Sequence, residues 1–504
     1  MNHPPVSPRI LALATGLVVA LAGCSSATPT ADSTTASTPT PTTAPVDAAA
    51  IVLQGVNDPG WRISNSQFRE GGIEGYANAV SVLPGEPVTL FVSSPTRAFT
   101  IDAYRMTGTA TSGALRVWRS PRLTGGRQTA TIATRATRSV AADWEPTVTV
   151  STKGWNEGAY LFRLAATDGS ASYVPLTVRS KSTAGKVVIA NAVLTWQAYN
   201  TWGGSSTYTS TDDGGSFSTR AYAASFDRPY VKGKGTGKFL SYELPVILRA
   251  ERLGIPLAYE TVLDVATRPG LLKGARGYVS LGHDEYWTAS ERDAVESARD
   301  AGTNLAFLGA NVSYWQVRLR AGPLGTNRVM DVYKSRTADP VKGNRATVLF
   351  RDVGRGENLM TGQFYECYPA TGDYTVINPG FFLFRGTGAV KGSTYRGVLE
   401  VEVDRAQVTA STPRPLQVVA RSRTTCGSTS TWSTSSYYTV KSGAGVFSTG
   451  SMGWILRGLG AASSKRSANF VGTVTDNVLR EMAKGPMGLS HPAVNNLDSL
   501  SLGG

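Results

Sequence analysis

The chain has 504 residues, a formal net charge of +14, and only three cysteines and three histidines. Lysine and arginine are spread along the chain, and no helix-turn-helix, zinc-finger or RNA-recognition signature accompanies them, so nucleic acid is not an expected partner. So few histidines and cysteines also disfavour a conventional zinc site and a cysteine nucleophile.

The first 50 residues predict export and membrane attachment. Arg9 precedes an apolar run, 10–22, that is too short to span a bilayer comfortably, which takes about 20 apolar residues. The stretch Leu21-Ala22-Gly23-Cys24 resembles the lipobox of bacterial lipoproteins, which implies a signal peptide over 1–23 and lipidation of Cys24. Residues 24–50 are rich in Ser, Thr and Pro and predict a disordered linker. We expect a lipid-anchored protein on the extracytoplasmic face of the cell membrane; an ordinary secretory signal is the alternative.

Two folded domains are expected after the linker. Residues 51–180 contain short apolar runs separated by turn-forming residues, which predicts an Ig-like β-sandwich. In 185–485, buried strands alternate with helices, which predicts an open, mostly parallel α/β sheet. The expected strands and helices of its first half are listed in chain order: strand 186–194, helix 245–253, strand 277–281, helix 288–301 with a Thr288–Glu291 capping box, and strand 304–308.

The second half of this domain is expected to differ from the first. Residues 329–445 are rich in strand and turn signals and predict a β-rich insertion or lobe, and 470–484 predicts a closing helix before a weakly patterned tail, 486–504. Cys367 and Cys426 are the cysteines left if Cys24 carries lipid. In an exported protein they predict a disulfide, with two buried thiols as the alternative.

Polar residues follow the three predicted parallel strands. In open parallel sheets the ligand site lies beyond the carboxyl ends of the strands, so Tyr199, Glu285 and Asn311 are expected on one rim. The richest stretch is Gly282-His-Asp-Glu-Tyr-Trp287, where Glu285 is expected at or just before the start of a helix, whose free N–H groups favour an anion. A carboxylate that only complements the helix terminus is the bland alternative.

Other chemistries find little support in the sequence. No Gly-x-Ser-x-Gly elbow stands between a strand and a helix, and the glycine-rich stretch 233–238 lacks the preceding strand of a phosphate loop. Oxygen ligands remain: phenolates and carboxylates are hard donors that suit Fe³⁺. Because tyrosine ionises near neutral pH only beside a cation, a tyrosine ligand predicts a metal ion.

Several motifs together resemble the large (β) subunit of N,N-dimethylformamidase and its relatives, over about residues 73–480. They are Ile73-Glu-Gly-Tyr-Ala77, Tyr104-Arg-Met106, Trp155-x-x-Gly158-x-Tyr160, Ala198-Tyr199-Asn200, Ser225-Phe-Asp-Arg-Pro-Tyr230, Gly282-His-Asp-Glu-Tyr-Trp287 and Gly309-Ala-Asn311-x-x-x-Trp315-x-x-Arg318. The resemblance implies a sandwich domain before an α/β domain related to the glutamine-amidotransferase fold. It also implies a mononuclear iron held by two tyrosines and a glutamate.

The resemblance assigns roles to individual residues. Tyr199 and Glu285 match two of the implied iron ligands, and Tyr160 is the best match for the second tyrosine, although ordinary strand packing explains it as well. His283, supported by Asp284, would manage protons. The same motifs supply the expected pocket residues Asn200, Asp227, Arg228, Asn311 and Trp315. The family's further catalytic carboxylate has no match in the divergent region after residue 320.

These features favour a surface-anchored, iron-dependent hydrolase of a C–N amide bond that acts on a small amide or an envelope component. The alternative from another class is a non-catalytic envelope lipoprotein that binds a glycan or a protein. A glycan-directed enzyme using Asp284 and Glu285 ranks last, because adjacent carboxylates seldom flank a substrate. The formamidase works with a small partner subunit; nothing in this sequence indicates one, and the question stays open.

Overall fold

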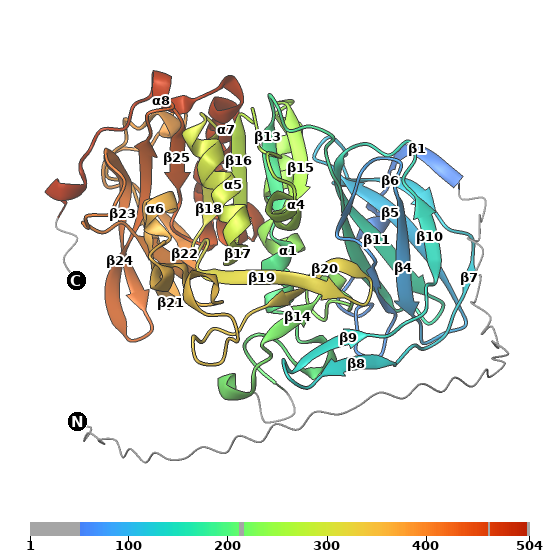
Figure 1. Cartoon of the computed structure of the whole chain (residues 1–504). Helices are drawn as coiled ribbons and strands as arrows, with labels where there is room; N and C mark the ends of the chain where they lie inside the picture. Colours follow the sequence, from blue (N-terminus) through green and yellow to red (C-terminus); the bar gives the residue numbers. More distant parts are fainter. Residues whose placement is uncertain (1–50, 211–215, 462–463, 501–504) are drawn as a thin grey trace, which may run out of the picture. The chain divides into compact units, whose positions relative to one another are not determined.

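The first region of the chain is a sandwich of two sheets (Figure 1). The structure is a computed structural model that describes residues 51–210, 216–461 and 464–500. One sheet has the order β1-β6-β5-β11-β12-β3, with β7 beside β5, and the other has the order β10-β4-β2. The strands are β1 Ile51–Asn57, β2 Glu74–Ala77, β3 Ser81–Val82, β4 Pro87–Ser93, β5 Ala98–Met106, β6 Ala114–Arg119, β7 Leu123–Thr124, β10 Val148–Ser151, β11 Gly158–Ala166 and β12 Ala171–Val178.

Alternating side chains of the two sheets form the core of the sandwich. Val88, Leu90 and Val92 of β4 face Phe162 and Leu164 of β11 in one buried apolar cluster. A separate hairpin, β8 (Thr131–Thr134) with β9 (Ser139–Ala142), projects from this region. It lies beside the segment that follows β13 in the next region, with the Ser205 hydroxyl donating to the Arg138 carbonyl at 2.8 Å.

The second region is built on a nine-stranded sheet with the order β15-β13-β16-β18-β25-β24-β23-β21-β22 (Figure 1). The first five of these strands are parallel, as near-continuous apolar runs such as Gly277–Gly282 predict. The strands are β13 Val187–Asn191, β15 Leu257–Thr261, β16 Gly277–Gly282, β18 Asn304–Gly309, β21 Phe364–Thr375, β22 Thr394–Arg405, β23 Leu416–Cys426, β24 Thr429–Thr439 and β25 Gly445–Ser448. A smaller sheet has the order β14-β20-β19-β17, formed by Ala223–Ser225, Gly325–Asp331, Trp315–Gly322 and Tyr286–Thr288.

The strands of the expected β-rich insertion, β21 to β24, continue the main sheet. β24 pairs antiparallel with β25, with Tyr437 opposite Phe447, and β23, β21 and β22 follow outward. The exposed edge of the parallel sheet is therefore covered by strands of the insertion.

Helices cover both faces of the nine-stranded sheet. In Figure 1, α4 and α5 lie on the near face and α7 lies behind it; α3 contacts α7. The helices are α1 Val193–Ala198, α2 Phe239–Tyr242, α3 Leu244–Arg252, α4 Val262–Thr267, α5 Ala289–Asp300, α6 Asn358–Thr361, α7 Lys465–Lys484 and α8 Met487–Ser490.

Two local expectations need correction. The apolar run 186–194 is a strand only as far as Asn191, and its end turns into α1. The capping box at the start of α5 is one-sided: the Thr288 hydroxyl accepts from the Glu291 amide at 3.0 Å, but both carboxylate oxygens of Glu291 are buried without a partner. Thr288 alone therefore caps the helix.

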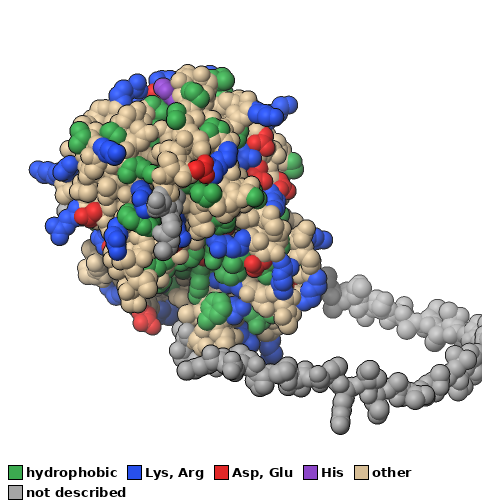
Figure 2. Space-filling model, turned by 90° about the vertical axis from the view of Figure 1, so that its left-hand side faces the viewer, with side chains coloured by type: hydrophobic (Ala, Val, Ile, Leu, Met, Phe, Trp, Pro, Cys, Tyr) green, Lys and Arg blue, Asp and Glu red, His purple; other side chains and the backbone are tan. Residues whose placement is uncertain are grey.

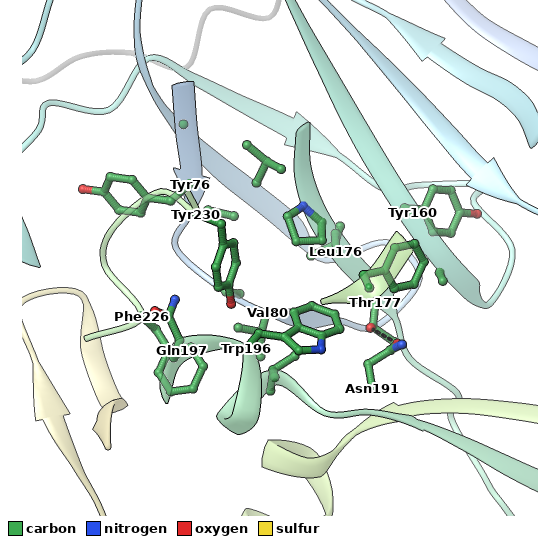
Figure 3. Close-up of a pocket in the computed structure, with 18 of the residues that line it drawn as sticks. Tyr76, Val80, Tyr160, Leu176, Thr177, Asn191, Trp196, Gln197, Phe226 and Tyr230 are labelled. Carbon is green, nitrogen blue, oxygen red and sulfur yellow. Dashed lines mark hydrogen bonds between the residues drawn. The ribbon is translucent and has the colours of Figure 1, made fainter. Parts of the chain in front are cut away.

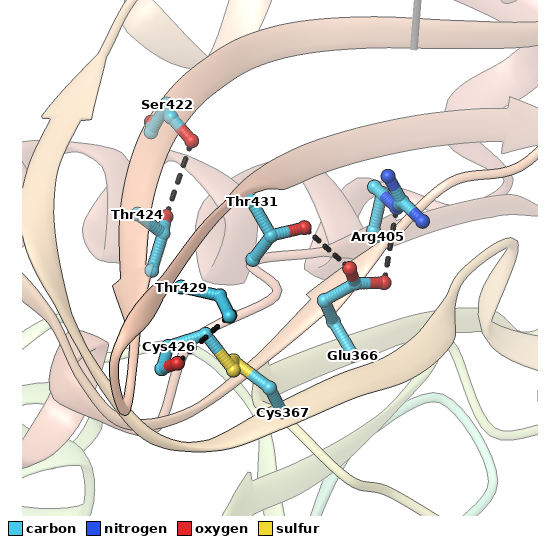
Figure 4. Close-up of a disulfide and its surroundings, with 8 residues drawn as sticks. All are labelled: Glu366, Cys367, Arg405, Ser422, Thr424, Cys426, Thr429 and Thr431. Atoms are coloured by element: carbon cyan, nitrogen blue, oxygen red, sulfur yellow. Dashed lines mark hydrogen bonds and ion pairs between the residues drawn. A yellow bond between two sulfur atoms is a disulfide. The ribbon is translucent and has the colours of Figure 1, made fainter. Parts of the chain in front are cut away.

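Cys367 and Cys426 form the expected disulfide (Figure 4). Their Cα atoms are 6.0 Å apart, on β21 and β23. Beside it, Glu366 pairs with Arg405 at 3.0 Å. The bridge ties two antiparallel strands of the insertion within the main sheet.

The two regions share contacts, and the described residues, which begin at 51, lie in one compact unit. On the face shown in Figure 2, Lys and Arg side chains lie singly or in small groups among uncharged ones. Among the described residues, no helix is long and apolar enough to cross a membrane. The predicted signal peptide, the lipidated Cys24 and the linker fall on residues 1–50, outside the described residues.

Candidate functional site

The rim formed by the carboxyl ends of β13, β16 and β18 carries a cluster of buried polar side chains. Tyr199 ends α1, directly after β13; His283 and Glu285 follow β16; Asn311 follows β18. The chain leaves β16 at Gly282 with a φ of 56°, and a Cβ atom there would lie 2.8 Å from the side chain of Tyr242. Only glycine fits this close turn, which directs the next residues to the rim.

Two phenols and one carboxylate converge at the centre of the cluster. The Tyr199 hydroxyl donates to Glu285 Oε2 at 2.6 Å, and the Tyr208 hydroxyl donates to Glu285 Oε1 at 2.8 Å. The two hydroxyl oxygens are 2.9 Å apart, and the rings stack with their centres 4.6 Å apart. The Glu285 backbone is fixed by its amide, which donates to Thr195 Oγ1 at 3.0 Å. Four hard oxygen atoms therefore share one buried space.

A histidine and a second glutamate border this oxygen cluster. His283 Nε2 lies 3.2 Å from Glu285 Oε2, 3.4 Å from the Tyr199 hydroxyl and 3.8 Å from Glu402 Oε2. The other ring nitrogen of His283 and Oε2 of Glu402 are buried without a hydrogen-bond partner. Both atoms are therefore free to accept or donate a proton beside the oxygen cluster.

Glu402 reaches the rim because β22 returns to the parallel part of the sheet. The amide of Met452, which follows β25, donates to the Glu402 carbonyl at 3.2 Å, and Asp404 and Gly450 are joined by a further backbone bond of 3.0 Å. Asp404 Oδ1 accepts from the amide of Asn311 at 2.9 Å. These bonds attach β22 both to the segment after β25 and to the turn after β18.

Two lysines flank the phenols without a carboxylate partner. Lys238 Nζ lies 4.0 Å from the centre of the Tyr199 ring, and Lys334 Nζ lies 3.3 Å from the centre of the Tyr208 ring. The Lys334 ammonium is buried without a hydrogen-bond acceptor. Burial lowers the pKa of Lys238 to about 8 and that of Lys334 to about 7, while the charge of Glu285 opposes both shifts.

The pKa values of Glu285 and Glu402 are shifted in opposite directions. Burial raises the pKa of Glu285, but the His283 hydrogen bond, the charge of Lys334 and the Tyr199 hydrogen bond outweigh it, and the net pKa is lowered. Burial and the charge of Glu285 raise the pKa of Glu402 well above its ordinary value. Of these two neighbouring carboxyls, Glu285 is therefore ionised and Glu402 is protonated.

The remaining groups of the cluster are neutral in the protein alone. Burial and then the Lys238 charge lower the pKa of His283 to about 4. Burial and then the Glu285 charge raise the pKa of Tyr199 and of Tyr208 well above 10. The phenols therefore keep their protons unless a cation replaces them.

Comparison with known families decides the family of the chain. The family described as N,N-dimethylformamidase beta subunit-like, C-terminal, matches residues 100–464, well over half of the chain. The chain belongs to this family. No curated protein matches the chain.

Comparison with solved structures finds a crystal structure from Paenibacillus sp., described as a cycloisomaltooligosaccharide glucanotransferase complexed with cycloisomaltoheptaose. The two sequences are 9% identical, the match covers 68% of this chain and 66% of the other chain, and the TM-score is 0.17. A likeness of this degree carries no argument about the fold or the function of this formamidase-like chain.

The structure brings together most of the residues expected at the rim. Tyr199, His283 and Glu285 contact one another, and the side chain of Asn311 hydrogen-bonds to Glu402. The Trp315 amide donates to the Glu285 carbonyl at 3.0 Å, and its ring centre lies 5.0 Å from Lys334 Nζ. These five residues form or border the site.

Asp284 and three expected pocket residues lie behind the site. The Asp284 carboxylate accepts from the Ser280 hydroxyl at 2.8 Å, away from the phenols, and burial raises its pKa to about 7. Asn200 and Arg228 support the segment that carries the tyrosines, and Asp227 pairs with Arg328 at 2.6 Å.

Tyr160 does not join the cluster, which corrects the second expected tyrosine ligand. Its hydroxyl donates to the Asn156 carbonyl at 2.6 Å, and its ring stacks on Trp155 in the sandwich core. Tyr160 borders a small cavity of about 30 Å³ between the two regions, with its hydroxyl turned away from that cavity (Figure 3). The tyrosine beside Tyr199 is Tyr208.

Sequence reasoning missed Tyr208, Glu402 and the two lysines. Tyr208 lies only nine residues after Tyr199, in a Gly/Ser/Thr-rich stretch, and the spacing was a usable signal. Glu402 lies in the alternating run 398–403 with Glu400, and the alternation alone does not say which face is buried. The lysines had no local signal at all.

The oxygen cluster fits the metal that the family implies. Among the described residues, no group of three or more His, Cys, Asp and Glu side chains is arranged to hold a metal; the ligand set here rests on phenols. Tyr199, Tyr208 and Glu285 offer hard donors that converge in a buried place, and the phenols need a cation to ionise. This donor set suits Fe³⁺.

Proposed function

We propose that this chain is a hydrolase of C–N amide bonds that uses a mononuclear iron held by Tyr199, Tyr208 and Glu285. The observation that carries the proposal is the convergence of the two phenol oxygens on one carboxylate, with distances of 2.6–2.9 Å. Membership of the formamidase-like family supports the reaction class. When bound, the ion would supply Lewis acidity toward an amide carbonyl and toward water.

The residues around the ligands would handle protons. His283 is neutral because its pKa is lowered, and its ring nitrogen without a partner, Nδ1, could accept a proton from water that attacks the amide. Glu402 is protonated because its pKa is raised, so its carboxyl can donate a proton to the departing nitrogen. The distance of 3.8 Å between His283 Nε2 and Glu402 Oε2 allows the proton to return between turnovers.

In this proposal the two lysines would help the phenols to ionise. Lys238 and Lys334 lie against the faces of the two phenol rings, where a positive charge favours loss of the phenol proton. They would lower the cost of forming two tyrosinates in a buried place. Asn311, bonded to Glu402, would hold that carboxyl in place.

The test is the metal content and visible spectrum of residues 51–504, produced without the lipid anchor. We expect about one iron per chain and a tyrosinate-to-Fe³⁺ band that gives the protein a colour. Tyr199→Phe, Tyr208→Phe and Glu285→Gln should each weaken or abolish the band. The iron-loaded protein should release amine from small carboxamides.

The matched control is Tyr160→Phe, which removes a buried phenol outside the cluster. It should keep both the band and the iron. A colourless wild-type protein that cannot be loaded with iron would end the metalloenzyme proposal and leave a non-catalytic binding protein. A coloured protein that hydrolyses no amide would retain the metal site and refute the reaction.

Further parts of the proposal concern the fold and the location. Its Ig-like sandwich and its glutamine-amidotransferase-like α/β domain are proposed from the family motifs. We also propose that Cys24 carries a lipid that holds the protein at the extracytoplasmic face of the membrane, near an envelope substrate. Cys24→Ala should release the protein from the membrane fraction. Co-purification under native conditions would identify a small partner subunit.

A further inference from the structure

Arg228 is a buried arginine whose partners are all uncharged oxygens. Only 1% of its surface is exposed. Nη1 donates to the carbonyls of Trp202 at 3.0 Å and Ser205 at 3.2 Å; Nη2 donates to those of Asn200 at 3.0 Å and Gln197 at 3.5 Å. Its neighbour Asp227 pairs with Arg328 instead, at 2.6 Å. The guanidinium thus acts as a fork that gathers backbone carbonyls.

The four carbonyls belong to one segment, 197–205, that contains Tyr199 and leads to Tyr208. This segment is the end of α1 followed by a turn with positive φ at Gly203 and Gly204, and it lies outside the strands of the two large sheets. The Gln197 carbonyl also accepts from the Asn200 amide at 3.1 Å, whereas Arg228 is the donor to the carbonyls of Asn200, Trp202 and Ser205. One side chain therefore determines the path of the chain around Tyr199.

The same segment fixes Tyr208. The amide and the hydroxyl of Thr207 both donate to the Ala198 carbonyl, at 3.2 and 3.0 Å. The residue before Tyr208 is thereby tied to the residue before Tyr199. A shift of the segment would move both phenol oxygens relative to Glu285, whose amide is bonded to Thr195 earlier on α1.

A buried guanidinium without a counter-ion is costly to take out of water, and its hydrogen bonds to the carbonyls offset that cost. What only arginine supplies is a planar fork of donors; lysine carries the same charge on a single nitrogen and cannot span four carbonyls. We infer that Arg228 is the positioning residue of the metal site, holding Tyr199 and Tyr208 at the spacing that lets both phenols bind one ion. This inference rests on the proposed function for the identity of the ion.

Arg228→Lys tests the inference, with Arg292→Lys as the matched control. Arg292 is also fully buried and donates to the backbone carbonyls of Arg355 and Gly356, but it lies on α5 and pairs with Glu296 at 2.8 Å. We expect Arg228→Lys to lower iron affinity by about 10- to 100-fold, as loss of an outer-shell partner does, and to shift the tyrosinate band. Arg292→Lys should change neither, although it loses stability.

A metal-free measurement separates this inference from the proposed function. Hydrogen exchange of the peptide that covers 197–208 should quicken in metal-free Arg228→Lys and stay unchanged in Arg292→Lys. If wild-type protein binds no iron, the proposed function fails, and the exchange comparison still decides whether Arg228 orders the tyrosine segment. Equal exchange and equal iron affinity in the two variants would overturn the inference.

A milder variant covers the case in which Arg228→Lys does not fold. Thr207→Val removes the hydroxyl bond to Ala198 and keeps the amide bond. It should lower iron affinity in the same direction by a smaller factor, whereas Thr236→Val, which loses a similar hydroxyl-to-carbonyl bond to Gly233, should not. Unchanged affinity in Thr207→Val would show that the segment does not set the phenols, and the inference would fall.

Discussion

Buried tyrosines in the sandwich and at the rim of the main sheet differ in what their hydroxyl groups meet. In the sandwich, Tyr160 donates to the Asn156 carbonyl and Tyr173 to the Trp61 carbonyl. At the rim, Tyr199 and Tyr208 donate to a carboxylate and lie against each other. A phenol on a backbone carbonyl is satisfied and acts as packing, whereas a phenol on a carboxylate holds a proton that a cation can replace.

The two regions also differ in how they serve the site. The sandwich supplies no group to the oxygen cluster, but it supports the tyrosine segment: Trp202 donates to Glu74 of β2 at 3.1 Å and packs with Tyr76 and Trp144. The α/β region supplies the chemical groups from the ends of its strands. Support and chemistry are thus divided between the regions, and substitutions in each should have separable effects.

The largest effect is expected from Glu402→Gln. If the protonated carboxyl donates to the leaving nitrogen, its loss should lower amide turnover by about 10²- to 10⁴-fold. The iron content and the tyrosinate band should be kept, because Glu402 is not a proposed ligand. Amine release per bound iron measures the effect.

Glu400→Gln is the control for this variant. Glu400 lies two residues earlier on β22 and pairs with Arg457, with one contact of 2.8 Å, outside the oxygen cluster. It should change turnover only a few-fold at most. Wild-type turnover in Glu402→Gln, or loss of its colour, would contradict the assignment.

Trp202→Ala should break the support of the site by the sandwich. Trp202 is buried between the two regions, and its removal should cost about 3–5 kcal/mol in the free energy of unfolding. Iron affinity should fall as well, since the tyrosine segment loses its anchor. Urea denaturation and iron titration measure the two effects.

Trp155→Ala separates the two effects. Trp155 stacks on Tyr160 inside the sandwich, with ring centres 5.0 Å apart, so its loss should cost similar stability. Iron affinity should stay at the wild-type level where the protein is folded. Equal losses of affinity in both variants would mean that the sandwich acts only through overall stability.

One buried carboxyl, that of Glu260, should make the protein less stable as the pH rises, because its pKa is raised. Glu285, whose pKa is lowered, should have the opposite effect on stability. Glu260 on β15 is fully buried; burial and then the charge of Asp264 raise its pKa to about 8, against the pull of Arg268 at 3.2 Å. From pH 4.5 to 8 the unfolded chain therefore releases this proton before the folded protein does. Stability should fall with rising pH in that window, by at most about 1.4 kcal/mol per pH unit, and level off above it.

Glu260→Gln removes this contribution. The free energy of unfolding, measured in urea between pH 5 and 9, should fall less steeply with pH in the variant than in the wild type. Parallel profiles would show that Glu260 is not protonated in the folded protein. The comparison with wild type cancels the contributions of the other buried carboxyls.

The sequence indicated the sheet rim correctly because a strand's carboxyl end follows from local pattern. Tyr199, Glu285 and Asn311 each come directly after a predicted parallel strand, and topology alone brings them together. Glu402 reaches the rim on β22, the outermost strand of the main sheet. The local sequence does not show that this strand comes back to the parallel strands. The resemblance indicated Tyr160 as the second tyrosine, and the sequence does not show that its hydroxyl faces a backbone carbonyl.

The smallest effect, from Tyr160→Phe, tests the opening comparison most directly. The variant removes one buried hydrogen bond to the Asn156 carbonyl and should cost about 1 kcal/mol in the free energy of unfolding. Iron affinity and colour should be unchanged, because this phenol points into packed protein. Tyr208→Phe should do the reverse: it keeps the ring against Lys334 and loses the colour. If Tyr160→Phe also bleached the protein, a buried phenol on a carbonyl would not be a mere packing element, and the distinction between the two regions would fail.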